Sequence, residues 1–499
     1  MTVEQARAEL KELQLKQFAY RYGLIITSLD ANTYAPKGSA EGRATAMSIM
    51  SGEMHKLFAG PQVGELLGFL NENKGELSPE EARQVELLKR SYDNQSKIPL
   101  EETIEYSKIQ NEAEVVWHDA KEKSDFAMFL PYLEKIVAYQ RKFAGYYDPN
   151  KKPYDALLNL YERGADMEML DKYFATIRST IVPLLAKTQA AAPIDDSFLY
   201  KYYDPEQQKK LSLWLMNLMG LNDTNCAIAE TEHPFTTGTD NHHARITTHY
   251  YPNAITFAMY STIHEGGHAL YELGVDDKYR YTALDGGVSM GVHESQSRFY
   301  ENIVGRSQAF TNFIFPKMVE LFPEQFKGIT PEHFYRAVNK AQPSLIRTEA
   351  DELTYSLHVL VRYEIEKLLI DGSLAVKDVP GVWNKMYKEY IGIDVPSDKE
   401  GCLQDSHWSG GSFGYFPSYS LGSAYGAQML ETMKKTLDID ACCAKGEIAP
   451  ITAWLREHIH KYGCMMDPGD VVKNACGAEF DPTFYANYLT KKFSALYNL

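Results

Sequence analysis

The segment Ile263-His264-Glu265-Gly266-Gly267-His268 constrains this chain more than any other stretch of its sequence. Its pattern, H-E-x-x-H, places two histidines four residues apart, and residues at that spacing share one face of an α-helix. His264 and His268 can therefore bind one metal ion together. The carboxylate of Glu265 then lies toward the open coordination position, where it can take a proton from a water molecule.

The flanks of this motif predict the helix that the metal site needs. Residues 258–263 include no helix breaker, and an apolar run at 269–273 leads to Gly274, which suits a helix end. Gly266 and Gly267 each cost about 1 kcal/mol of helix stability. We therefore expect substrate or another backbone to come close to them. The alternative is a buried helix whose histidines are satisfied by hydrogen bonds in the core.

A third ligand decides the type of site. A metzincin needs glycine and histidine where this chain has Tyr271 and Gly274, so that class is excluded. Among the acids that follow, Glu294 is the best candidate, because it opens a second apolar-periodic helix after a glycine-rich turn at 285–287. The other acidic candidates are Glu272, Asp276, Asp277 and Asp285.

Two other interpretations of this region stay open. His293 is a rival third ligand, although neighbouring helical residues point about a quarter-turn apart. Glu294 could also be a first-turn acid that the helix dipole favours. Two histidines, one glutamate and a water form the pattern of a catalytic zinc site, whereas structural zinc sites are usually closed and rich in cysteine.

Composition narrows the functional class. The 499 residues include 51 basic and 67 acidic side chains, and the resulting net charge of −16 argues against binding to nucleic acid or to an anionic membrane. No run approaches eighteen apolar residues, so no transmembrane helix is predicted. The N-terminus lacks the apolar region of a signal peptide. The six cysteines lack zinc-finger spacing, which favours free thiols in a reducing cytoplasm.

The rest of the chain predicts one mainly helical body over residues 1–499, split by a deep groove. Apolar residues between Leu357 and Leu369 follow helical spacing, and residues 78–81 and 330–332 are typical helix starts. The clearest strand signal is 244–251, and such a strand beside the site could pair with an extended peptide. The segment 401–426 is rich in glycine and aromatic residues, as expected for the wall of a site.

Six short motifs follow one another along the chain: His233-Pro234-Phe235, then His243-Ala244-Arg245-Ile246-Thr247, His264 to His268, His293-Glu294-Ser295-Gln296, Ile346-Arg347-Thr348-Glu349-Ala350-Asp351, and Gly401 to Trp408. Together they resemble, in the same order, the motifs of the carboxypeptidase Taq family of metallocarboxypeptidases. The segment 29–44 is also similar to the family's N-terminal segment, with Leu29 where tryptophan is usual, so the resemblance covers nearly the whole chain.

The resemblance implies a mostly helical fold like that of neurolysin and angiotensin-converting enzyme, with the site in a long groove and a small β element beside it. It also implies one zinc ion per chain, for which cobalt can substitute, and homodimers. The implied activity is the removal of single residues from peptide C-termini, with broad specificity that disfavours C-terminal proline.

The resemblance also implies roles at the site. Glu265 acts as the base, and Tyr415 is the first candidate to stabilise the oxyanion, with Tyr419 the second. Aromatic packing is the alternative for both tyrosines. His233 and His407 are candidates for hydrogen bonds to the substrate backbone, although either could be an ordinary loop histidine.

A carboxypeptidase must also bind a free carboxylate, which calls for an arginine. Arg347 is our candidate, and a structural ion pair with Glu349 or Asp351 is the alternative. Arg245 is the rival, but the family motif has aspartate where this chain has His243. If that aspartate normally orients the arginine, Arg245 is held differently here.

Three functions therefore compete. The first is a zinc carboxypeptidase, and the second is a zinc oligopeptidase that cuts short peptides internally. The third is an inactive helical protein that binds peptides or a partner. The presence of Glu265 and of three candidate metal ligands argues against the third.

Overall fold

Helix starts and stops encoded in the sequence are formed in the computed structural model, which describes residues 1–499. Helix α4 (Pro79–Ser96) has a complete capping box, in which Ser78 and Glu81 each accept a hydrogen bond from the backbone N–H of the other. Helix α13 (Pro331–Val338) is capped by Thr330. Helix α14 (Tyr355–Asp371) ends at Gly372, whose φ of +90° is the left-handed conformation that glycine adopts at low cost.

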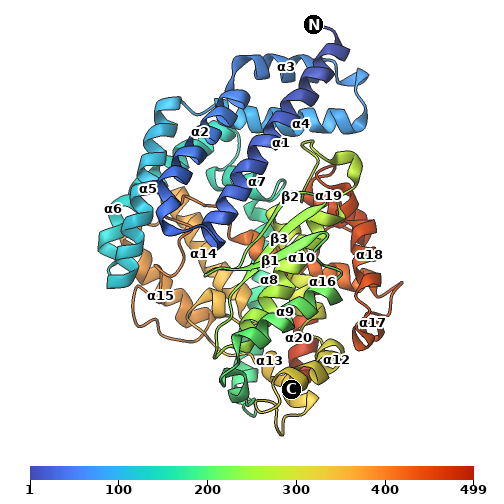
Figure 1. Ribbon diagram of the computed structural model, residues 1–499. Helices are drawn as coiled ribbons and strands as arrows, with labels where there is room; N and C mark the ends of the chain where they lie inside the picture. The colour runs from blue at the N-terminus through green and yellow to red at the C-terminus, as the bar shows by residue number, and fades with distance from the viewer.

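The four N-terminal helices share a small core of their own, and they stand at the end of the molecule that carries the N-terminus (Figure 1). In this unit α2 buries none of its side chains. Several contacts hold the unit to the remaining chain, among them Arg83 Nη2, which lies 2.6 Å from Asp467 Oδ1, and the N–H of Ala283, which donates to Gln14 at 2.7 Å. Besides α4, its helices are α1 (Val3–Thr33), α2 (Ala40–Ala59) and α3 (Pro61–Glu72).

The other helices enclose one continuous hydrophobic core, whose members run from Tyr106 to Tyr497 in the sequence. The prediction of a mainly helical protein is confirmed. Besides α13 and α14, the helices away from the site are α5 (Leu100–Lys123), α6 (Phe126–Tyr147), α7 (Pro153–Tyr161), α8 (Met167–Ala190), α9 (Pro205–Leu218), α12 (Gln308–Leu321), α15 (Val379–Tyr390), α17 (Ile439–Lys445), α18 (Ala449–His458), α19 (Pro468–Cys476) and α20 (Thr483–Tyr497).

A three-stranded sheet lies beside α10, in the order β1-β3-β2. Its strands are β1 (Cys226–Glu230), β2 (Thr236–Asp240) and β3 (His243–Thr248), with β1 parallel and β2 antiparallel to β3. The predicted strand 244–251 is therefore too long, because the chain leaves the sheet after Thr248. The expectation that this strand pairs with a peptide is wrong, since β3 is central and both its edges are already occupied. The edge strand nearest the motif is β2.

Two helices packed at close range carry the candidate site. The first is α10 (Ile255–Gly274), which ends at the predicted glycine, and the second is α11 (Met290–Arg298), followed by a π-helical segment (Phe299–Val304). A Cβ atom on Gly267 would lie 2.7 Å from the carbonyl oxygen of Gln296, so the expected close approach of another backbone is confirmed. Helix α11 begins before Glu294, so Glu294 is not a first-turn acid.

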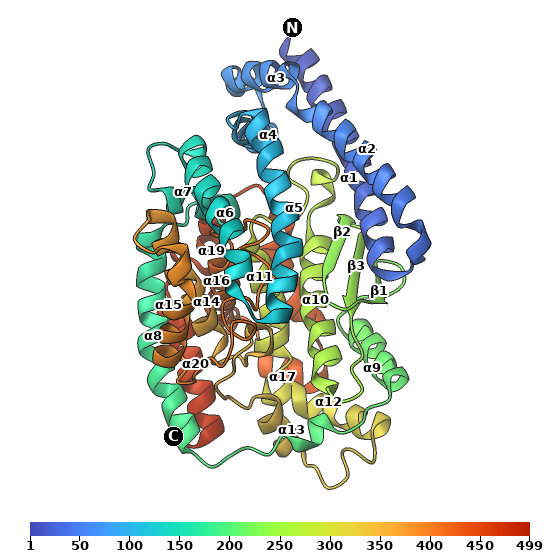
Figure 2. The same cartoon turned by 90° about the vertical axis from the view of Figure 1, so that its left-hand side faces the viewer.

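Helix α16 (Pro417–Met433) packs on the other side of α11. A Cβ atom on Gly422 would lie 2.6 Å from Cβ of Glu294, so glycine is required there too. Figure 2 shows α10 and α11 between the α1–α2 pair on one side and α6, α8 and α15 on the other. None of the helices is both long and apolar enough to span a membrane.

Candidate metal centre

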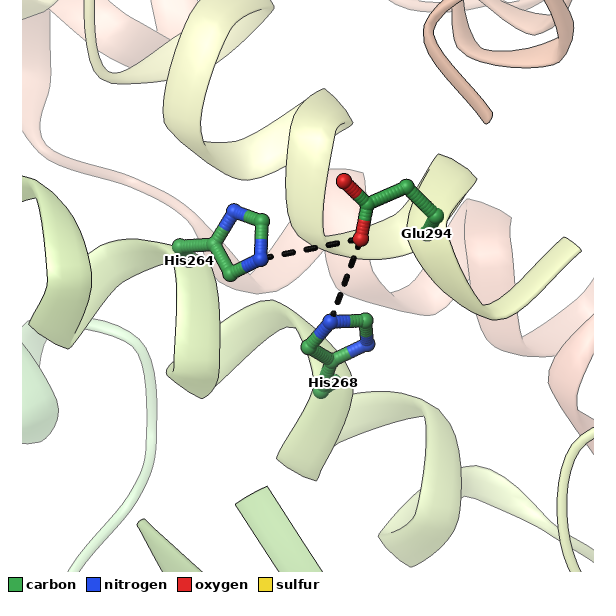
Figure 3. A group of neighbouring side chains, drawn as sticks. All are labelled: His264, His268 and Glu294. Atoms are coloured by element: carbon green, nitrogen blue, oxygen red, sulfur yellow. Dashed lines mark ion pairs between the residues drawn. The ribbon is translucent and has the colours of Figure 1, made fainter. Parts of the chain in front are cut away.

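Three side chains from α10 and α11 converge on one point (Figure 3). Oε2 of Glu294 lies 3.7 Å from Nε2 of His264 and 3.5 Å from Nε2 of His268. Ligand atoms bound to a tetrahedral zinc at ~2.0–2.1 Å lie roughly 3.3–3.5 Å from one another. Two imidazole nitrogens and one carboxylate oxygen at these separations fit such an ion, and the trio is the set expected from the sequence.

Arg298 fixes the orientation of the Glu294 carboxylate. Its Nε donates to Oε1 of Glu294 at 2.7 Å, which leaves Oε2 facing the two histidines. Burial works against ionisation, yet the charges of Arg298 and His264 lower the pKa of Glu294 well below its ordinary value. The candidate ligand is therefore a carboxylate already turned toward the metal position.

Each histidine of the motif uses its other ring nitrogen for a hydrogen bond. Nδ1 of His264 lies 2.8 Å from Oε2 of Glu301, and Nδ1 of His268 lies 2.6 Å from Nδ1 of His293. Glu301 sits in the π-helical segment, and such segments are frequent at functional sites. The roles of Glu301 and Arg298 could not be predicted from the sequence, because neither residue stands in a recognised spacing relative to His264.

His293 does not join the ligand trio. While Nδ1 of His293 faces His268, its Nε2 lies 2.6 Å from Oε1 of Glu272 on α10. The sequence analysis considered His293 and Glu272 as rival ligands, and the structure instead pairs them with each other behind His268. The glycine-rich turn could have indicated that a side chain packs closely there. A Cβ atom on Gly287 would lie 2.5 Å from Cδ2 of His293.

Glu265 is held against the sheet edge. The hydroxyl of Thr236, on β2, lies 2.6 Å from Oε2 of Glu265 and 2.9 Å from its carbonyl oxygen. Burial raises the pKa of Glu265 above its ordinary value, although the neighbouring His264 charge works against this. A carboxylate with a raised pKa is a better proton acceptor, which suits the role of base.

A second charged cluster lies in and beside the loop 401–416. Asp405 is shared by two arginines: Nη2 of Arg347 lies 2.9 Å from Oδ1, and Nε of Arg362 donates to Oδ2 at 2.8 Å. These two charges hold the pKa of the buried Asp405 far below its ordinary value. Two guanidinium groups facing one carboxylate leave one positive charge in excess. Arg362 was not identified from the sequence.

Arg347 does not form the structural ion pair with Glu349 or Asp351 that was the alternative to substrate binding. Its ion-pair partner is Asp405 and not Glu349 or Asp351, and its Nη1 donates to the hydroxyl of Tyr355 at 3.0 Å. The residue is only 6% exposed. It also lies against Tyr419, with the guanidinium carbon 4.8 Å from the ring centroid.

Tyr415, Tyr419 and His407 form one aromatic group. The ring centroids of the two tyrosines are 5.1 Å apart, and Nε2 of His407 lies 3.2 Å from the hydroxyl of Tyr419. Burial raises the pKa of Tyr415, and the charge of Glu294 raises it further. The pKa of Tyr419 is raised even more strongly by burial. Both phenols therefore keep their protons and can donate hydrogen bonds, while burial lowers the pKa of His407 to about 4 and keeps it neutral.

The remaining candidates lie in or beside the sheet. Nε of Arg245 donates to Nε2 of His243 at 2.6 Å, and Nδ1 of His243 lies 2.8 Å from the hydroxyl of Thr239. His243 thus orients the arginine as a neutral acceptor, because burial and the charge of Arg245 lower its pKa. His233 is exposed in the connection between β1 and β2.

Comparisons with known proteins find relatives that match over the full length of the chain. Carboxypeptidase 1 of Bacillus subtilis (strain 168) is 40% identical over 501 residues, covering 100% of both chains. The crystal structure of an M32 carboxypeptidase from Deinococcus radiodurans R1 superposes with a TM-score of 0.96 at 35% identity, covering 99% of this chain and 100% of that one. Metallocarboxypeptidase 1 of Trypanosoma cruzi gives a TM-score of 0.94 at 32% identity over 99% of this chain and 100% of that one.

The sequence model of the carboxypeptidase Taq (M32) metallopeptidases matches residues 11–493. The resemblance drawn from six motifs is therefore confirmed over almost the whole chain. This protein belongs to the carboxypeptidase Taq (M32) family of metallopeptidases, which are peptide hydrolases.

Proposed function

We propose that this protein is a zinc-dependent carboxypeptidase that removes single amino acids from peptide C-termini, with broad specificity that disfavours C-terminal proline. The observation that carries the proposal is the position of Glu294 Oε2, 3.7 Å and 3.5 Å from Nε2 of His264 and His268, with Glu265 next to them in the chain. One zinc ion per chain fits this donor set, and cobalt, which accepts the same nitrogen and oxygen ligands, can replace it.

The metal ion and the Glu265 carboxylate supply different parts of the proposed hydrolysis. When bound, zinc supplies Lewis-acid chemistry that polarises the scissile carbonyl and makes a water molecule more acidic. Glu265 would serve as the general base that takes a proton from the attacking water, and it would then deliver that proton to the leaving amine. Its hydrogen bond from Thr236 keeps the carboxylate on the β2 side of the site.

Two tyrosines are suited to stabilise the oxyanion that develops on the scissile carbonyl. Tyr415 remains the first candidate from the family resemblance, and burial raises the pKa of its phenol, which therefore keeps its proton. Tyr419 is the second, because its hydroxyl faces His407 at 3.2 Å. A preorganised donor of this kind contributes about 2.7–4 kcal/mol to transition-state stabilisation.

The C-terminal carboxylate of the substrate is assigned to Arg347. The excess positive charge of Arg347 and Arg362 over Asp405 supports this role, because a charge-assisted bond to a carboxylate contributes roughly 1.5–3 kcal/mol. Arg245 is the rival, with only its Nε engaged, by His243. His407 and the exposed His233 are the candidates for hydrogen bonds to the substrate backbone.

The domain organisation, the oligomeric state and the cellular compartment are proposed from the family resemblance. We propose that residues 1–499 act as one catalytic unit, that the protein is a homodimer, and that it works in the cytoplasm on peptides. The six cysteines all remain free thiols, which is consistent with a reducing compartment.

Mass spectrometry of a single peptide tests the proposal. A decapeptide with a free C-terminus is incubated with the zinc-loaded protein, and products are identified over time. The expected result is a ladder that loses one residue at a time from the C-terminus. Internal fragments as the first products would identify an oligopeptidase instead, and an intact peptide in the presence of bound zinc would identify a binding protein.

A further inference from the structure

We propose that His293 and Glu272 are positioning residues that set the tautomer and ring orientation of His268, through a chain of two hydrogen bonds from the histidine ring to a carboxylate. The chain runs from Nδ1 of His268 to Nδ1 of His293 at 2.6 Å, and from Nε2 of His293 to Oε1 of Glu272 at 2.6 Å. The inference rests on the proposed metal centre, although not on the peptide that is cut.

The position of the protons follows from the carboxylate at the end of the chain. A singly protonated imidazole has one donor nitrogen and one acceptor nitrogen. Glu272 is an acceptor, so the proton of His293 lies on Nε2 and its Nδ1 accepts. His268 must then carry its own proton on Nδ1, which leaves the lone pair on Nε2.

Nε2 of His268 is the atom that faces the metal position, 3.5 Å from Oε2 of Glu294. The opposite tautomer of His293 would donate a proton to Nδ1 of His268 and move the proton of His268 onto Nε2, where it blocks a metal bond. The pairing of His293 with Glu272 therefore selects the form of His268 that can act as a ligand.

The packing around His293 is built to hold this ring. The centroids of the His293 and Tyr271 rings are 5.0 Å apart, and a Cβ atom on Gly287 would lie 2.5 Å from Cδ2 of His293. Glycine at 287 therefore leaves the ring the space it occupies. A Cβ atom on Gly286, whose φ is +102°, would lie 3.5 Å from Oε2 of Glu272, so the same turn also covers the carboxylate.

His264, the other candidate histidine ligand, is oriented by one direct hydrogen bond and not by a chain of two. Nδ1 of His264 reaches Glu301 directly at 2.8 Å, with no ring in between. One segment, from His293 to Glu301, thus provides the third ligand and a hydrogen-bond partner for each histidine. The two partners differ in kind: His264 is bonded to a carboxylate, and His268 is bonded to a second imidazole.

The test measures zinc affinity by competition with a chromophoric chelator. It uses the metal-free wild-type protein and four metal-free variants. His293→Asn places an amide oxygen at the position of Nδ1 and keeps the acceptor for His268. His293→Gln places its amide at the position of Nε2, keeps a partner for Glu272 and leaves His268 without an acceptor. Glu272→Gln offers a donor to His293 and allows the wrong tautomer.

The fourth variant, His242→Gln, is the matched control. His242 and Asp277 also form a histidine–carboxylate pair at 2.6 Å, but the pair is exposed and lies apart from His264, His268 and Glu294. We expect zinc affinity to fall about 10- to 100-fold in His293→Gln and Glu272→Gln. It should stay within about threefold of wild type in His293→Asn and in the control. The visible spectrum of the cobalt-loaded protein should change in His293→Gln and Glu272→Gln only.

Two results would overturn the inference. One is wild-type zinc affinity in His293→Gln, and the other is an equal loss in both His293 variants together with a lower melting temperature of the apo protein, which would assign the ring to packing. Zinc affinity is measured without substrate, so a protein that binds zinc normally and cuts no peptide would refute the proposed function and leave this test intact.

Discussion

Nε of Arg298 donates a hydrogen bond to Oε1 of Glu294 at 2.7 Å, one turn earlier on α11. Only Oε2 of Glu294 is then left to face the histidines of α10. The arginine is itself held by Glu301, which lies 3.1 Å from its Nη1, and Glu301 also orients His264. Glu294, the candidate third ligand, and His264 are therefore coupled through one guanidinium group.

This coupling predicts that Glu294→Ala loses metal together with activity, because it removes the one ligand oxygen from α11. His293→Ala should lose less metal, since that ring orients a ligand and does not itself bind the ion. Elemental analysis of the purified variants measures both. Full zinc occupancy in Glu294→Ala would show that another residue is the third ligand.

We predict that Glu265→Gln keeps its zinc and loses at least about 100-fold in turnover, the usual cost of removing a general base. The amide can still accept the hydrogen bond from Thr236, so the fold should be unaffected. Zinc content and kcat are measured on the same sample. Turnover within about tenfold of wild type would remove Glu265 from the role of base.

Arg347→Ala is predicted to lower kcat/KM for free-acid peptides by about 10- to 200-fold, as roughly 1.5–3 kcal/mol of lost interaction implies. Arg362 continues to pair with Asp405 in this variant, so no buried charge is left alone. Zinc content and the slow reaction with amidated peptides should hold. Equal losses on both substrates would assign Arg347 to the fold, and Arg245→Ala, the matched variant, would then be tested in the same way.

Because of the buried carboxyl group of Glu366, we expect the stability of the folded protein to depend on pH. This carboxyl on α14 accepts hydrogen bonds from Nε1 of Trp408 at 2.9 Å and from the N–H of Gly414 at 2.8 Å, and so ties the loop 401–416 to the core. Burial raises its pKa from 4.5 to about 7. Because the pKa is higher in the folded state, its contribution is complete below pH 4.5 and is lost as the pH rises through 7.

Glu366→Gln cannot ionise and removes this dependence. The melting temperature of the wild type should therefore fall relative to that of the variant between about pH 5 and pH 8. A constant difference over that range would mean that Glu366 keeps an ordinary pKa.

Sequence patterns predicted α10, because a histidine pair at i and i+4 and a terminal glycine are local signals. The strand at β3 was predicted from its β-branched residues, but β2 was missed because it contains Gly238 and Asp240, which are rare in strands. Its position as the edge beside Glu265 depends on the pairing of strands, which no local pattern encodes.

The partners of the site residues were the least predictable part. Glu301 reaches His264 across 37 positions of sequence, and Asp405 reaches Arg347 across 58. Such contacts depend on how the helices and the loop pack in three dimensions. The glycines at 267, 287 and 422 were visible in the sequence, yet what they accommodate became clear only when the packed neighbours were known.

The most direct test of the account compares two copies of one peptide that differ only at the C-terminus, one a free acid and one an amide. Initial rates are measured with the zinc-loaded protein, and products are identified by mass spectrometry. The account predicts that the free acid loses its last residue at least about tenfold faster than the amide, the smallest difference that the lost carboxylate contact implies. Equal rates on the two peptides, with cleavage at an internal bond, would contradict it.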